Sequence, residues 1–134
     1  MKKKTLDSKA YAVKRSPAGL GLYAGIAYKR GDFIIEYTGE RISEDEANRR
    51  GGRYLFTVTE DITIDGKGRK NIARYINHSC APNAEAESDE DELKIRIFAR
   101  RKINPGDEIL YDYGKEHWDE YIQPHGCKCT VCVQ

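Results

Sequence analysis

The chain has 134 residues, of which 39% are hydrophobic and 34% are charged, so it is long enough for one domain around a single core. Its 23 Lys and Arg residues nearly balance its 22 Asp and Glu residues, which leaves a formal net charge of +1. This balance argues against a globally basic nucleic-acid-binding protein and against binding driven by an anionic membrane surface.

The N-terminal flank, residues 1–10, is basic but carries no apolar segment. Three lysines follow Met1, yet Leu6-Asp7-Ser8-Lys9 stands where a secretion signal needs an apolar stretch. No apolar run in the chain approaches the roughly 20 residues of a membrane helix. We therefore expect a soluble intracellular protein with no membrane partner. The sequence does not decide between nucleus and cytoplasm, nor whether a microbial product of this kind is exported to a host cell.

Short runs of β-branched and aromatic residues between turn residues predict strands for much of the chain. In chain order these runs are Tyr11–Arg15, Leu22–Ile26, Phe33–Tyr37, Tyr54–Val58, Ile62–Asp65, Leu93–Phe98 and Glu108–Tyr113. Helix is scarce. Ser43 and Glu46 predict a capping box that begins a short helix to about Arg50, and residues 71–76 predict one or two further turns. The predicted fold class is therefore mostly β, with small sheets and long connections.

An acidic segment lies between two of the predicted strands. From Glu85 to Glu92 the chain has six acidic residues and no basic one. We interpret this segment as a solvated hairpin turn. The alternative interpretation is a docking surface for a basic peptide.

Two polar or glycine-rich motifs are candidates for a functional site. Ala18-Gly19-Leu20-Gly21 either lets a ligand approach the main chain or makes a turn between two strands. Asn77-His78-Ser79-Cys80 suits neither a regular helix nor a regular strand. In this run His78 and Cys80 suggest a Cys–His nucleophile pair or metal ligands, and the alternative is a polar loop.

Tyrosines and cysteines supply the remaining candidates. Tyr111 and Tyr113 share one face of a predicted strand, where half-buried or surface packing is the simpler interpretation. Cys127, Cys129 and Cys132 cluster near the end of the sequence, and clustered thiols in a reducing compartment favour a metal over disulfides. Because structural zinc takes four ligands, the distant Cys80 is the candidate for the fourth, and a redox dithiol of Cys129 and Cys132 is the alternative.

Taken in this order, the motifs resemble the SET domain of protein-lysine methyltransferases. The matching segments are Gly19–Tyr23, Tyr54–Phe56, Arg74–Asn83, Gly106–Tyr113 and the C-terminal cysteines, so the resemblance covers residues 11–132. It implies a β-clip fold of several small curved antiparallel sheets around a pseudoknot, with few short helices. The domain is expected to span residues 11–122, with a short variable insert at about 40–53. A post-SET zinc-binding tail is expected at 123–134.

The resemblance also implies a reaction and two bound groups. Members of the family transfer a methyl group from S-adenosylmethionine to a lysine ε-amine of a protein. The residues expected to hold this cofactor are Ala18, Gly19, Leu20, Gly21, Tyr54, Arg74, Asn77, His78 and Lys128. One structural Zn²⁺ is expected at Cys80, Cys127, Cys129 and Cys132, although the last two are closer in sequence than is usual in the family. This assignment makes Cys80 a zinc ligand and His78 a scaffold for the cofactor site, rather than a nucleophile pair.

Two tyrosines carry the implied chemistry. Tyr113 matches the catalytic tyrosine of the family. In the family's reaction the attacking lysine must be neutral, and its burial in an aromatic channel favours the neutral amine. Tyr111 matches a position that holds Tyr or Phe, and Tyr there implies mono- or dimethylation because its hydroxyl crowds the amine. Trp118 and Tyr121 either line the lysine channel or pack as ordinary apolar residues.

The expected function is a protein-lysine N-methyltransferase whose partner is a lysine-containing protein or peptide. A histone tail, another basic protein or a host protein would each fit, and no nucleic-acid binding is expected. The alternative is a non-enzymatic SET-like module that binds a peptide or the cofactor, against which the presence of Tyr113, Asn77 and His78 argues. A small zinc-containing nucleic-acid-binding module fits the near-neutral charge less well.

Overall fold

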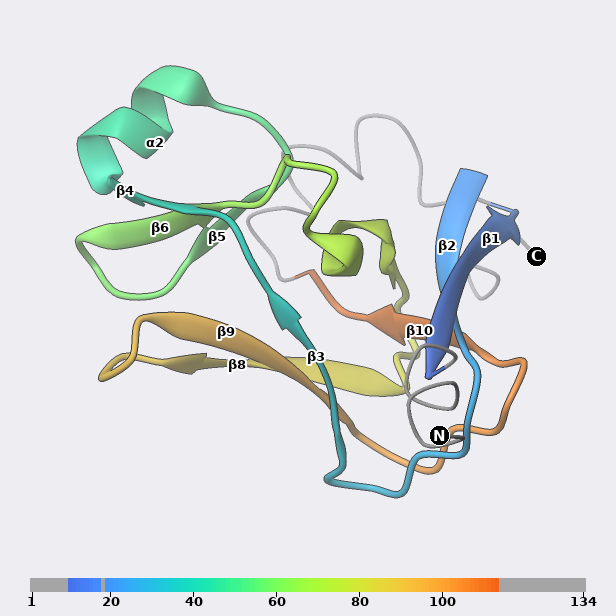
Figure 1. The fold of residues 1–134 in the computed structure, drawn as a ribbon. Helices are drawn as coiled ribbons and strands as arrows, with labels where there is room; N and C mark the ends of the chain where they lie inside the picture. Colours follow the sequence, from blue (N-terminus) through green and yellow to red (C-terminus); the bar gives the residue numbers. More distant parts are fainter. Residues whose placement is uncertain (1–9, 18, 114–134) are drawn as a thin grey trace, which may run out of the picture.

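The computed structural model describes residues 10–17 and 19–113, whose main secondary structure is short strands (Figure 1). The strands are β1 (Tyr11–Ser16), β2 (Gly19–Ala24), β3 (Phe33–Tyr37), β4 (Glu40–Ser43), β5 (Leu55–Thr57), β6 (Ile62–Asp65), β7 (Asn77–His78), β8 (Ala84–Asp89), β9 (Lys94–Ala99) and β10 (Glu108–Tyr111). The helices within the described ranges are α2 (Glu44–Arg50) and the 3-10 helix η1 (Ile72–Tyr75). The mostly-β fold class predicted from the sequence is confirmed.

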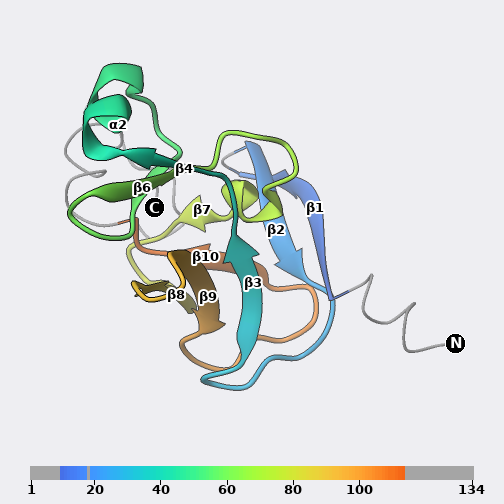
Figure 2. The ribbon, with the colours of Figure 1, turned by 60° about the vertical axis from the view of Figure 1, so that its left-hand side comes forward.

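The described strands form three small sheets (Figures 1 and 2). Their strand orders are β1-β2-β10-β7, β3-β9-β8 and β4-β6-β5. The pairings between these strands are antiparallel except for the parallel pairing of β7 with β10. That parallel pairing sets Asn77 beside Leu110 and His78 beside Tyr111. It therefore brings together two candidate motifs that are far apart in the sequence.

Side chains from all three sheets share one hydrophobic core. The burial pattern of β9 alternates, with Ile95, Ile97 and Ala99 buried on one face, as expected for a strand with one face on a core. Leu22 of β2 and Ile64 of β6 belong to the same cluster. The polypeptide segments that leave the ends of these strands are thereby held in fixed positions, which is the condition for a preorganised site.

Of the capping box predicted before α2, the structure shows the N-cap bond of Ser43, whereas the Glu46 carboxylate binds Arg49 and Arg50. The Ser43 hydroxyl accepts a hydrogen bond from the backbone N–H of Glu46 at 3.1 Å, and the helix ends at Arg50. Gly51 and Gly52 follow with φ values of 63° and 108°, which L-residues with side chains rarely adopt. Within residues 10–17 and 19–113, no helix is both long and apolar enough to cross a bilayer.

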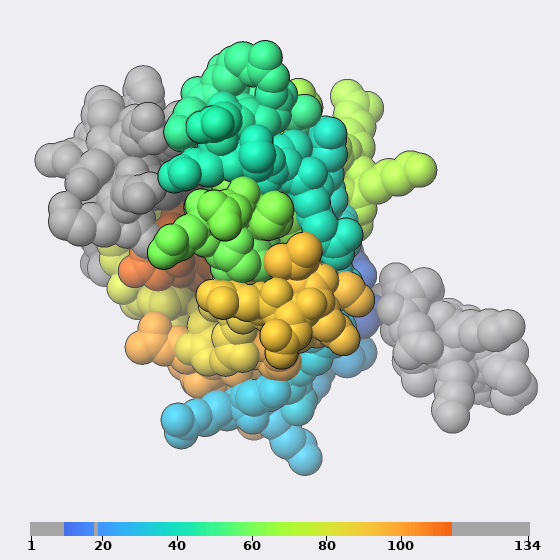
Figure 3. All heavy atoms as spheres, turned by 90° about the vertical axis from the view of Figure 1, so that its left-hand side faces the viewer, coloured from blue at the N-terminus to red at the C-terminus, as the bar shows by residue number. Residues whose placement is uncertain are grey.

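The acidic segment is more regular than the predicted hairpin turn. Residues 84–89 form strand β8, and only residues 90–93 form the turn to β9. In β8 the side chains of Glu85 and Glu87 are exposed while Ala84 is buried, so the acidic residues occupy the solvent face of a strand. The turn lies on the surface next to the residues of β5 and β6 (Figure 3). A docking role for this surface stays a prediction.

The Asn77-His78 run also departs from the sequence interpretation. These two residues, predicted to be irregular, form the short strand β7. Their main chain adopts this conformation because it pairs with β10, which is more than thirty residues further along the chain. Local residue preferences carry no signal for such a pairing.

Candidate functional site

A cleft of about 1120 Å³ is lined by segments that are far apart in the sequence. Six predicted site residues line it, namely Leu20, Tyr54, Arg74, Asn77, Tyr111 and Tyr113. Gly19, Gly21, His78 and Cys80 are described but are not among the lining residues. The structure therefore gathers most of the described candidates around one space, with the others in neighbouring positions of the same strands and loops.

One wall of the cleft begins at the start of β2, which is held by the side chain of Asn77. Its Nδ2 donates to the carbonyl oxygen of Leu20 at 2.9 Å, to Oε2 of Glu108 at 2.9 Å and to the hydroxyl of Ser16 at 3.1 Å. A Cβ atom added at Gly21 would lie 2.4 Å from Glu108 Oε2. Glycine at this point lets the Glu108 carboxylate and Ser16 pack directly against the main chain, while the neighbouring Leu20 lines the cleft.

A second wall is formed by Arg74 and Tyr54. The guanidinium carbon of Arg74 lies 4.7 Å from the centroid of the Tyr54 ring, within the range of a cation–π interaction. Its Nη1 donates to the carbonyl oxygen of Lys67, whereas its buried Nε has no hydrogen-bond partner among the described residues. A buried donor without a partner is costly, so this position suits a ligand that carries an acceptor such as a carboxylate.

Aromatic rings line the far side of the cleft. The ring centroids of Tyr111 and Tyr113 are 5.0 Å apart, and the Phe56 ring lies parallel to Tyr111 at 6.4 Å. Tyr37 packs against Phe56 at 5.3 Å. Sequence reasoning did not identify Tyr37 and Phe56 as site residues; their positions in predicted strands gave a signal for burial but none for the cleft.

Tyr113 is fixed at both its main chain and its side chain. Its hydroxyl donates to the carbonyl oxygen of Ile76, and its backbone N–H donates to Nδ1 of His78 at 3.1 Å. Burial raises the pKa of Tyr113, and burial likewise raises the pKa of Tyr111 well above its ordinary value. Both phenols are therefore protonated at neutral pH, so neither acts as a general base there. The sequence had favoured surface or half-buried tyrosines, and Tyr111 is instead buried.

The geometry of His78 bears on the alternative of a Cys–His nucleophile pair. Its Nδ1 accepts the N–H of Tyr113, so the proton of the neutral imidazole resides on Nε2, which lies 3.6 Å from Sγ of Cys80. Burial lowers the pKa of His78, and the nearby carboxylate of Asp112 opposes that shift. A neutral imidazole with its proton on Nε2 cannot accept the Cys80 proton at that atom, which argues against the nucleophile pair.

The remaining predicted site residues lie outside the described residues. They are Ala18, Trp118, Tyr121, Cys127, Lys128, Cys129 and Cys132. In residues 10–17 and 19–113 the structure contains no group of three or more His, Cys, Asp or Glu side chains that could hold a metal ion.

Comparisons with known proteins agree with this geometry. The family model described as SET domain matches residues 19–114. The histone-lysine N-methyltransferase, H3 lysine-4 specific, of Schizosaccharomyces pombe is 43% identical over 105 residues, which cover 70% of this chain and 11% of that protein. The histone-lysine N-methyltransferase trr of Drosophila melanogaster is 37% identical over 133 residues, which cover 91% of this chain and 6% of that protein.

A solved structure shows the same fold. The crystal structure of the Chaetomium thermophilum polycomb repressive complex 2 matches with a TM-score of 0.72 and 35% identity, over 80% of this chain and 15% of the matched chain. This chain thus spans only a small part of the proteins that it matches. The matched family model covers strands β2 to β10 and the lining residues of the cleft, and the chain belongs to the SET domain family.

Proposed function

We propose that the chain is a protein-lysine N-methyltransferase that transfers a methyl group from S-adenosylmethionine to the ε-amine of a lysine. The observation that carries the proposal is the cleft, where the Arg74–Tyr54 wall and the Tyr111–Tyr113 wall face one space. The relatives named as histone-lysine N-methyltransferases support the same reaction. They also support a protein substrate, for which a histone or another lysine-rich protein inside the cell is the simplest choice.

The described residues fit the proposed cofactor. SET methyltransferases use S-adenosylmethionine, which carries a carboxylate, an adenosine and a methylated sulfonium. The partnerless Nε of Arg74 suits the carboxylate, the Tyr54 ring suits an aromatic or cationic surface, and Leu20 at the start of β2 lines the same cleft. When bound, the cofactor supplies an electrophilic methyl group.

The aromatic wall prepares the lysine for attack. A free lysine has a pKa of about 10.4 and is mostly protonated at neutral pH. Against the edge-to-face rings of Tyr111 and Tyr113, which both line the cleft, the ammonium loses hydration, which lowers its pKa and favours the neutral amine. The amine nitrogen then forms the bond to the methyl carbon as the carbon–sulfur bond breaks. Tyr113, anchored to Ile76, orients the nitrogen and forms no covalent intermediate.

Transfer of labelled methyl groups tests this proposal. The chain is incubated with labelled S-adenosylmethionine and either core histones or a mixed protein lysate, and labelled sites are identified by mass spectrometry. We expect label on lysine side chains. Cofactor binding without label in any protein offered would instead support the non-enzymatic binding module.

Replacing Tyr111 with Phe is expected to raise the share of di- and trimethylated product. The Tyr111 hydroxyl sits in a buried position beside Tyr113, so its removal leaves room for a bulkier amine. Product methyl states are counted by mass spectrometry of the modified peptide. Tyr28→Phe is the control, because Tyr28 is also buried but its hydroxyl donates to Ala10, away from the lining residues of the cleft. An unchanged methyl distribution in Tyr111→Phe would contradict the assignment.

We also propose one structural zinc ion held by Cys80, Cys127, Cys129 and Cys132. Four thiolates are a common ligand set for structural zinc, and Cys80 is exposed and therefore accessible as a ligand. Elemental analysis of the purified chain is expected to give one zinc per molecule, and Cys132→Ser is expected to lose it together with thermal stability. Full zinc occupancy in both Cys80→Ser and Cys132→Ser would contradict this ligand set.

A further inference from the structure

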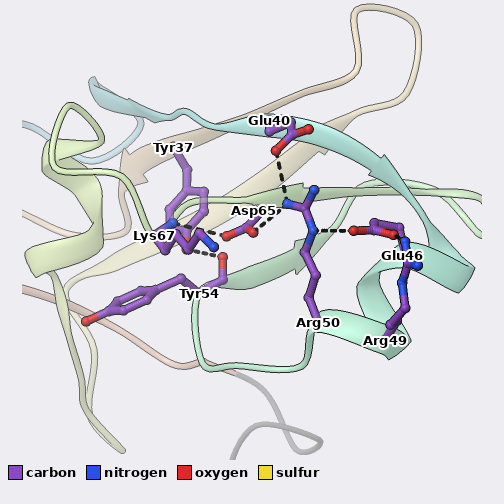
Figure 4. A network of polar contacts seen from close by, with 8 residues as sticks. All are labelled: Tyr37, Glu40, Glu46, Arg49, Arg50, Tyr54, Asp65 and Lys67. Atoms are coloured by element: carbon purple, nitrogen blue, oxygen red, sulfur yellow. Dashed lines mark hydrogen bonds and ion pairs between the residues drawn. The ribbon is translucent and has the colours of Figure 1, made fainter.

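Arg50, the last residue of α2, joins three elements through carboxylates (Figure 4). Its Nε donates to Glu46 of the same helix at 2.6 Å, and its Nη1 donates to Glu40 of β4 at 3.0 Å. The same Nη1 donates to Oδ2 of Asp65, at the end of β6, at 2.9 Å. The Asp65 side chain is only 5% exposed, so Arg50 supplies the positive charge that a buried carboxylate requires.

The turn that begins at Asp65 holds both residues of the Arg74–Tyr54 wall. Oδ1 of Asp65 accepts the N–H of Lys67 at 3.3 Å, which shapes the turn. The N–H of Gly66 donates to the carbonyl oxygen of Tyr54 at 2.9 Å. The carbonyl oxygen of Lys67 accepts a hydrogen bond from the Arg74 guanidinium. A shift of this turn therefore moves both sides of the cation–π pair in the cleft.

The turn is closely packed on its inner side. A Cβ added at Gly66 would lie 2.4 Å from the Tyr37 ring and 2.5 Å from Nδ2 of Asn71. The Tyr37 hydroxyl donates to the carbonyl oxygen of Tyr54 at 2.8 Å, next to the Gly66 contact. The inner side of the turn is therefore filled, and Arg50 holds Asp65 at the start of the turn (Figure 4).

The link from α2 to Tyr54 passes through two glycines. Gly51 and Gly52 have φ values of 63° and 108°, and an added Cβ at either position would meet nothing within 4 Å. Glycines in such conformations add little rigidity of their own. Arg50 anchors the end of α2 immediately before this link, and the Tyr54 carbonyl at its other end is held by Gly66 and Tyr37.

We propose that Arg50 is a positioning residue for the cofactor side of the cleft. Its Nη1, bonded to Glu40 and Asp65, holds the end of α2 and the 65–68 turn together, and that turn sets the Tyr54 carbonyl and the Arg74 guanidinium. The inference rests on the proposed function, because it assigns the Arg74–Tyr54 wall to S-adenosylmethionine. Arg50 itself is not a lining residue of the cleft, so it is proposed to act through the turn and not by contact with the cofactor or the lysine.

The test compares two adjacent arginines of the full chain. Arg50→Met is expected to weaken binding of S-adenosylhomocysteine, measured by calorimetry, by about tenfold and to raise the KM for S-adenosylmethionine by a similar factor, with a smaller change in kcat. Arg50→Lys keeps the charge but has one nitrogen in place of the separate Nε and Nη1 donors, so its affinity is expected to lie between those of Arg50→Met and the parent. Arg49→Met is the control, because Arg49 also pairs with Glu46 but its side chain is 78% exposed. Its cofactor affinity is expected to equal that of the parent.

A double variant separates positioning from folding. Arg50→Met leaves the buried Asp65 carboxylate without its cation and lowers the Tm. Adding Asp65→Asn removes that charge but keeps an oxygen that accepts the N–H of Lys67. The Tm is therefore expected to recover, while the affinity for S-adenosylhomocysteine stays about tenfold lower than that of the parent. Recovery of affinity together with the Tm would overturn the inference, as would equal affinities in Arg50→Met and Arg49→Met. A parent chain that binds the cofactor product but methylates nothing would overturn the proposed function alone, and a parent that does not bind it would overturn both.

Discussion

Tyr113→Phe is expected to lower the rate of lysine methylation at least about 100-fold, the effect typical of removing one preorganised hydrogen-bonding group at a reacting centre. The ring contacts of Tyr113 with Tyr111 and His78 do not involve the hydroxyl, so the shape of the cleft is retained. The hydroxyl bonded to Ile76 is lost, and with it the group that orients the amine. The rate is measured with labelled S-adenosylmethionine at saturating substrate.

Two measurements on Tyr113→Phe separate chemistry from binding and folding. The affinity for S-adenosylhomocysteine is expected to stay close to that of the parent, and the Tm is expected to fall only modestly because the Ile76 carbonyl loses its donor while the variant remains folded at the assay temperature. A variant that methylates lysine at the parent rate would show that the hydroxyl has no part in the reaction. Loss of cofactor affinity in step with the rate would place Tyr113 in the binding of the cofactor instead.

Asn77→Ala is expected to abolish tight cofactor binding and to lower the free energy of unfolding by about 1–3 kcal/mol, the range for lost hydrogen bonds to a charged group. One Nδ2 group serves the Leu20 carbonyl, the Glu108 carboxylate and the Ser16 hydroxyl. Without it the start of β2 loses its connection to β7 and β10, and the main-chain wall of the cleft is free to shift. Calorimetric titration and chemical unfolding measure the two effects.

Asn83→Ala is the matched control for Asn77→Ala. Asn83 also binds β10, since its Nδ2 donates to the carbonyl oxygen of Glu108 at 2.8 Å and its Oδ1 accepts the N–H of Leu110 at 2.9 Å. It is buried and is not a lining residue of the cleft. We expect Asn83→Ala to lose stability but to bind the cofactor like the parent. Equal losses of affinity in the two variants would show that Asn77 acts only through the stability of the sheet.

The sequence predicts those parts of the fold whose signal is local. The alternation of Ile95, Ile97 and Ala99 is visible in β9 because side chains on a strand alternate between two faces. The start of α2 is visible because Ser43 and Glu46 are three residues apart. Strand β7 is not visible, since its two residues are extended only through pairing with β10.

In the candidate site too, the sequence identifies some residues, whereas other contacts appear only in the folded structure. The order of the motifs identifies Asn77, Tyr111 and Tyr113, which the structure brings to one cleft. The contacts of Arg50 with Asp65 leave no mark in the sequence, because they join the end of a helix to the end of a strand fifteen residues later. Such contacts depend on how the sheets pack, and only the folded chain shows them.

A crystal structure of the chain with S-adenosylhomocysteine and a lysine peptide would test the central claim most directly. The account predicts the cofactor product against the Leu20 main chain, Tyr54 and Arg74, and the lysine side chain against the rings of Tyr111 and Tyr113 that line the cleft. The ε-nitrogen should face the sulfur and lie within hydrogen-bonding distance of the Tyr113 hydroxyl. A cofactor product bound outside the cleft, or a lysine that enters away from Tyr113, would contradict the account.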